Sequence, residues 1–320
     1  MQSGWSRAGW LGVASLLAAG AAWAAAVKSD SAPTLKFTAG EALAQGDFRY
    51  IGGVYVDAKD RVYVGGDRQV AVYAAKGGKA LQKWTVPLTR VEAVAVDKAG
   101  YVYVAGYAEG NKPQILKLAN DDSGKVQTQW GEAGSGPGQI GGMCGLGVTD
   151  QYVLLGDPRN RCVNRYDKEG KFVDALGKRT SNKMAGFSTC CGILDFGTDA
   201  AGNIYVGNLG AHRVEVLNPK GQPVAHWGQS GDGPKDFCGC CNPVSVAVAP
   251  NGVVFTSEKT IPRIKAFSAK EHKLLAVLGE GEFGAGCARL DIAVDSKLNV
   301  YGVDNTKNVV RVYHPPQKLN

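Results

Sequence analysis

A six-fold repeat of a short hairpin pattern constrains the fold of this chain more than any other feature. Its first copy spans residues 54–64 (VYVDAKDRVYV), where apolar residues alternate with others on both sides of a polar turn. Successive strand residues face opposite sides of a sheet, and Asp bonds to the backbone of the turn it opens, so the pattern predicts a β-hairpin. The six turns open at Asp57, Asp97, Thr149, Asp199, Ala249 and Asp295, which lie 40 to 52 residues apart.

Further apolar segments follow the hairpins, as residues 70–73 and 81–84 follow the first one. Four strands at such a period are typical of propeller blades. The sixth repeat ends after its third strand, and residues 34–37 precede the first repeat, so we expect the two chain ends to complete one blade together. This closure leaves no long unpaired edge. The sequence therefore predicts an all-β fold, a six-bladed β-propeller of four-stranded blades.

The N-terminal segment has a different character, because residues 8–27 contain no charge. Such a segment predicts an apolar helix that serves either as a cleaved secretory signal or as a retained membrane anchor. Both alternatives place the body of the protein outside the cytoplasm, on the periplasmic side, either secreted or anchored. We therefore divide the chain into a signal or anchor with a short linker (1–32), the propeller (33–316) and a tail (317–320).

The charge distribution argues against nucleic acid as a partner. The net charge of +7 is spread along the chain with no run of five basic residues, and an exported protein with scattered charge has no basic binding face. Glu258 and Lys259 are expected to form a solvated pair. The histidines fall at unrelated positions of the repeats, so a metal-binding ring around the channel is not favoured; they are His212, His226, His272 and His314.

Three segments resemble a known family of repeats. Residues 207–214 (GNLGAHRV) are similar to the loop and third strand of NHL-repeat β-propellers, and the likeness extends over nearly all of residues 45–315. Residues 237–243 (FCGCCNP) and 257–263 (SEKTIPR) resemble a bacterial exported subgroup with a G-C-C-N-P element. The resemblance implies a six-bladed propeller and carries no assigned activity.

Eight cysteines carry the main chemical signal, and none precedes residue 144. Four of them each follow an apolar residue by four positions, in connections that lead into the innermost strands: Cys144, Cys191, Cys241 and Cys287. Propeller connections of this kind gather on one face, around the mouth of the central channel. We therefore expect all eight to share one face, with Cys162, Cys190, Cys238 and Cys240 beside the first four.

Three interpretations of this cysteine set are open. Thiols from neighbouring blades that converge on one centre favour an iron–sulfur cluster, which usually takes four thiolates. An even number in an oxidising compartment also fits disulfides, and clustered thiols suit a soft metal such as zinc or copper(I). The leading prediction is an electron-transfer protein or a redox subunit of a membrane complex, with a membrane or extracytoplasmic redox partner. The alternatives are a disulfide-stabilised interaction scaffold without metal and a metal-dependent propeller enzyme.

Overall fold

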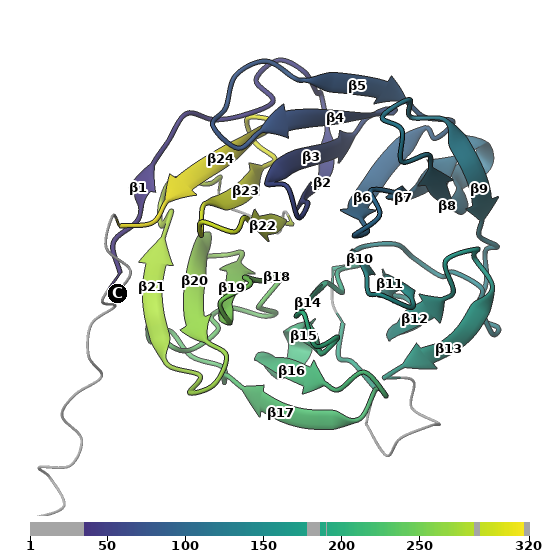
Figure 1. Ribbon diagram of the computed structural model, residues 1–320. Coiled ribbons are helices and arrows are strands. Elements are labelled where there is room, and N and C mark those ends of the chain that lie inside the picture. The colour runs from purple at the N-terminus through teal and green to yellow at the C-terminus, as the bar shows by residue number, and fades with distance from the viewer. Residues whose placement is uncertain (1–34, 178–185, 190, 285–288, 317–320) are drawn as a thin grey trace, which may run out of the picture. The chain divides into compact units, whose positions relative to one another are not determined.

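The computed structural model describes residues 35–177, 186–189, 191–284 and 289–316, and in this part of the chain the regular structure is almost entirely strand. The strands form six antiparallel four-stranded sheets, which are arranged as blades in a ring (Figure 1). The innermost strands of consecutive blades are neighbours all the way around, and the innermost strand of blade 6 lies next to that of blade 1. The predicted six-bladed propeller is therefore confirmed.

Blade 1 contains β2 (Ile51–Val56), β3 (Arg61–Gly66), β4 (Gln69–Ala74) and β5 (Gln82–Thr85). Blade 2 contains β6 (Arg90–Val96), β7 (Val102–Ala108), β8 (Lys112–Leu118) and β9 (Val126–Trp130), with the short 3-10 helix η1 (Glu109–Asn111). Blade 3 contains β10 (Leu146–Val148), β11 (Val153–Asp157), β12 (Cys162–Tyr166) and β13 (Phe172–Leu176).

Blade 4 contains β14 (Phe196–Thr198), β15 (Ile204–Asn208), β16 (Arg213–Leu217) and β17 (Pro223–Trp227), with η2 (Leu209–Ala211). Blade 5 contains β18 (Ser245–Val248), β19 (Val253–Glu258), β20 (Arg263–Ser268) and β21 (Leu274–Leu278). Blade 6 contains β22 (Ile292–Val294), β23 (Val300–Asp304), β24 (Val309–His314) and, from the other end of the chain, β1 (Thr38–Ala39).

The two ends of the chain close the ring as expected, because β1 pairs antiparallel with β24 through Thr38 opposite His314 and Ala39 opposite Tyr313. The closing strand lies at residues 38–39, however, and not at residues 34–37. The backbone N–H of Leu35 instead donates to the carbonyl of Leu275 (3.0 Å). Leu35 and Phe37 are apolar because they pack on the buried cluster between blades 5 and 6, and this packing mimics a strand pattern.

The hairpin turns use their aspartates as the sequence predicted. The Asp199 Oδ1 atom accepts the backbone N–H groups of Ala201 (3.0 Å) and Asn203 (2.8 Å), and Asp57, Asp97 and Asp295 bind their own turns in the same way. These carboxylates therefore stabilise the turns and do not form a ring of ligands.

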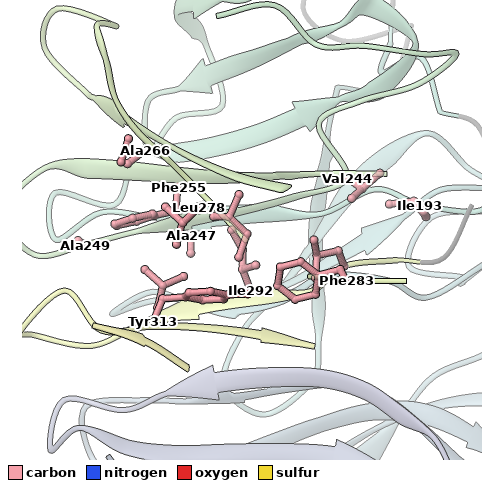
Figure 2. Packing of buried hydrophobic residues seen from close by; sticks show 14 of the residues in the cluster. Ile193, Val244, Ala247, Ala249, Phe255, Ala266, Leu278, Phe283, Ile292 and Tyr313 are labelled. Carbon is pink, nitrogen blue, oxygen red and sulfur yellow. The ribbon is translucent and has the colours of Figure 1, made fainter. Parts of the chain in front are cut away.

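The apolar core lies in layers between neighbouring blades. The layer between blades 5 and 6 joins Phe255 and Leu278 to Ile292 and Tyr313 (Figure 2), and all four side chains are buried. Burying apolar area of this kind supplies most of the favourable free energy of folding. Among the described residues, no helix is long and apolar enough to cross a membrane. The predicted N-terminal helix lies outside the described residues.

Candidate functional site

The described cysteines lie at one end of the blades. Cys144, Cys191, Cys238, Cys240 and Cys241 lie in connections that lead into innermost strands, and Cys162 begins β12 just after the β11–β12 loop. Because the blades are antiparallel, both kinds of connection lie on the same face. Cys190 and Cys287, the other two predicted ligands, lie outside the described residues.

Three sulfurs from two connections meet on this face, and we call Cys191, Cys240 and Cys241 the sulfur patch. The Cys241 Sγ atom lies 3.1 Å from the Cys240 Sγ and 4.0 Å from the Cys191 Sγ. Cys241 is buried and disulfide-bonded, whereas Cys191 and Cys240 are exposed. The patch therefore places sulfurs that are 50 residues apart in sequence within contact distance and leaves two of them open to solvent.

Lys259 lies next to the sulfur patch, in the loop after β19. Its Nζ atom lies 3.0 Å from the Cys191 Sγ, although only 1% of the residue is exposed. The backbone around it is held by the fully buried Asn242, which accepts from the Lys259 N–H (2.9 Å) and donates to the Lys259 carbonyl (3.0 Å). Asn242 also donates to the Cys238 carbonyl (2.6 Å). One side chain thus locks the Lys259 loop to the cysteine-bearing connection.

Cys238 belongs to a different environment, a buried charge cluster in blade 5. Its thiol donates to the Glu258 Oε2 atom (3.2 Å), and burial together with this bond raises the pKa of Cys238. Glu258 also pairs with Arg263 (Nε to Oε1, 3.2 Å) and Lys265 (Nζ to Oε1, 2.5 Å). Glu258 and Lys259 are both buried, so the expectation of a solvated pair is wrong. The pattern of residues along β19 and in the loop after it did not indicate that these two side chains are buried.

Cys144 and Cys162 have buried surroundings of their own. Burial raises the pKa of the Cys144 thiol to about 12, and Cys144 packs in the same apolar cluster as Cys241 and Ile193. The Cys162 thiol donates to the Asn164 side chain in its own strand (3.5 Å). A buried thiol with a raised pKa stays protonated at neutral pH, so Cys144 is a packing residue in this structure.

The repeats show that Cys144 and Cys191 are not at equivalent positions. The carbonyls of Gly145 and Asp195 occupy equivalent positions, since they accept N–H groups from Gly156 (2.8 Å) and Gly207 (3.0 Å) on the second strands. Cys191 lies four residues before Asp195, whereas Cys144 lies directly before Gly145. The connection after Ile140 is shorter, so counting from this residue gave an equivalence that is wrong for Cys144.

A charged group that the sequence analysis missed lies beside the central cavity. The guanidinium of Arg289 donates through Nη1 to the carbonyls of Gly52 (3.3 Å), Glu92 (3.2 Å) and Cys144 (3.2 Å). Its Nη2 donates to the Asp291 Oδ1 atom (2.8 Å) and lies 3.6 Å from the Asp195 Oδ2 atom. One side chain therefore links blades 1, 2, 3, 4 and 6.

The cavity beneath Arg289 has a volume of about 130 Å³ and is lined by the innermost strands of all six blades. Asp195 and Asp291 recur at one position of the repeat, within Leu194-Asp195-Phe196 and Leu290-Asp291-Ile292, and this recurrence was the available signal. In the described part of the chain, no group of three or more His, Cys, Asp or Glu residues is placed to hold a metal ion.

Comparison with solved structures identifies a shared fold. The chain is similar to the WD40 β-propeller domain of Doa1, with 12% sequence identity and a TM-score of 0.52 over 84% of this chain and 79% of that one. At this identity the likeness establishes a β-propeller and nothing finer. No protein-family model matches the chain, and no curated protein matches it. The assignment to NHL repeats stays a prediction.

Proposed function

We propose that the protein is an extracytoplasmic redox protein whose propeller presents a cysteine-based redox centre to a partner. The observation that carries this proposal is the sulfur patch, in which sulfurs at 3.1 and 4.0 Å from the Cys241 Sγ belong to exposed residues. Sulfurs that serve only as isolated structural disulfides have no need of further sulfurs within contact distance. The buried ammonium of Lys259 beside Cys191 favours negative charge on sulfur, and both metal ligands and redox nucleophiles are thiolates.

An iron–sulfur cluster is the bound group that we propose for this centre. Cys191, Cys240 and Cys241 would supply three of the four thiolates that a cluster usually takes. The Cys240 and Cys191 sulfurs lie 3.1 and 4.0 Å from that of Cys241, so a small rearrangement of the connections would have to bring them to one centre. Because Cys241 is disulfide-bonded, these residues fit a cluster once that disulfide is reduced. A bound cluster would supply one-electron transfer. The protein residues would hold it on the face that carries the connections into the innermost strands, where a membrane complex or a soluble carrier of the periplasm could approach.

The composition of the protein after anaerobic purification tests this proposal. We expect the protein to contain iron and acid-labile sulfide and to have an absorbance band at about 400 nm. Both are lost in Cys191→Ser and Cys241→Ser. Cys162→Ser is the matched control, since this cysteine is buried at the start of β12, and it retains them. A colourless protein that contains no iron or sulfide after anaerobic purification contradicts the cluster.

A second candidate, a disulfide-stabilised interaction scaffold, is favoured by the disulfide at Cys241 and by the propeller fold. A disulfide cross-link stabilises mainly by restricting the unfolded chain. In this case mass mapping finds the cysteines in native bridges, and reduction lowers the melting temperature without any change in a redox signal. The same face of the propeller would then dock a protein partner.

A further inference from the structure

We propose that Lys259 is the charge-compensating residue of the sulfur patch and that its ammonium stabilises a negatively charged sulfur at Cys191. The proposal deepens the redox function proposed above, because it names a positioning residue for that centre. It applies to a thiolate that binds a metal and to a thiolate that exchanges with a disulfide, since both carry the same negative charge.

The geometry around Lys259 supports this assignment. In the described part of the chain, the Cys191 sulfur at 3.0 Å is the one hydrogen-bond acceptor of the Lys259 ammonium. Only 1% of the residue is exposed, so water does not replace that partner. A buried cation needs a counter-charge, because removing an ammonium from water is costly when it is unpaired.

The neighbouring acid does not serve as this counter-charge. Glu258 is next to Lys259 in sequence, but its carboxylate accepts from Arg263, Lys265 and the Cys238 thiol. The Arg263 Nη1 atom also lies 3.6 Å from the Glu280 Oε2 atom, so the two cations of the buried blade-5 cluster are matched by two carboxylates. Lys259 is a further cation outside these pairs, and its contact with Cys191 favours anionic sulfur there.

The position of Lys259 is set by the fold and not by the flexibility of a surface side chain. Asn242 binds both the N–H and the carbonyl of Lys259 (2.9 and 3.0 Å) and lies directly after Cys241 in the chain. The same connection that carries Cys240 and Cys241 thus anchors the residue that faces Cys191. We infer that the two cysteine-bearing connections and the Lys259 loop act as one unit.

Alkylation kinetics of the reduced, metal-free protein test the proposal. The protein is treated with iodoacetamide at pH 7, and the rate at Cys191 is read by peptide mass spectrometry. We expect Lys259→Met to slow alkylation of Cys191 by roughly tenfold, because thiolate and not thiol is the nucleophile. Lys259→Arg restores most of the rate. Cys240, which is also exposed, changes less in the same samples.

The matched control is Lys265→Met, which removes another fully buried lysine of blade 5 whose ammonium contacts Glu258. We expect this variant to lower the stability of the protein without slowing the alkylation of Cys191. Equal rates in Lys259→Met and the wild type, or equal slowing in both variants, overturn the proposal. If Lys259→Met fails to fold, the wild type decides: anionic iodoacetate must be favoured over iodoacetamide more strongly at Cys191 than at Cys240.

This experiment is independent of the iron analysis. If the protein contains no iron but Lys259→Met slows the alkylation of Cys191, the cluster is refuted and the charge-compensating role stands. If the protein contains iron and Lys259→Met leaves the alkylation rate of Cys191 unchanged, the cluster stands and the charge-compensating role is refuted.

Discussion

At the scale of single residues, burial decides the chemistry more than residue type does. Eight cysteines look alike in the sequence, yet burial raises the pKa of Cys144 to about 12, and Cys238 donates to a carboxylate. Cys191 and Cys240 are exposed beside a third sulfur. Reactive cysteines are recognised by accessible, electropositive surroundings, and these surroundings single out Cys191.

Asp195 provides a pH prediction at this scale. Burial and the nearby Asp291 raise its pKa to about 7, against the opposing effect of Arg289, from an ordinary value of 3.8. At pH values between these two pKa values, the Asp195 carboxyl is therefore protonated in the folded state and ionised in the unfolded state. The contribution of Asp195 to the free energy of unfolding is full below about pH 4 and falls as the pH rises to about 7.

Asp195→Asn removes this dependence, because the amide does not titrate. Urea unfolding of both proteins at several pH values between 4 and 8 measures the difference in slope. A variant whose stability declines with pH as steeply as that of the wild type would show that Asp195 is ionised in the folded protein.

At the scale of elements, each strand is encoded locally, whereas ring closure depends on a short pairing between distant segments. The Gly40 N–H donates to the Val312 carbonyl (2.8 Å) at the end of the β1–β24 pair. Gly40→Pro removes this donor, and a net loss of about 1–3 kcal/mol in the free energy of unfolding is expected.

Gly40→Ala is the companion variant, because it keeps the N–H. The atoms nearest to its Cβ belong to the His314 ring and lie closer than van der Waals contact, so this side chain has to move aside. Thermal unfolding of the two variants separates the lost hydrogen bond from steric crowding. If Gly40→Ala is destabilised as much as Gly40→Pro, crowding against His314 and not strand pairing limits closure.

At the scale of the whole molecule, Arg289 joins five blades at the central cavity. Arg289→Met leaves Asp195 and Asp291 buried without their cation, and removing one partner from a buried ion pair costs about 3–5 kcal/mol. We expect a corresponding drop in the denaturant midpoint. Lys98→Met is the control, since the side chains of its pair with Asp150 are 76% and 71% exposed and such a pair contributes at most about 1 kcal/mol. Similar losses in both variants would refute the central role of Arg289.

The amino-acid sequence alone determined the blades of this protein. Alternating apolar residues and Asp-opened turns act over a few neighbouring residues, so six hairpins and their four-stranded sheets were predictable from Asp57 to Asp295. The tertiary structure alone decided which cysteines meet, that Glu258 and Lys259 are buried, and that Arg289 reaches Gly52, 237 residues away in sequence. Such contacts depend on how the closed ring brings distant connections together, and no local pattern carries that information.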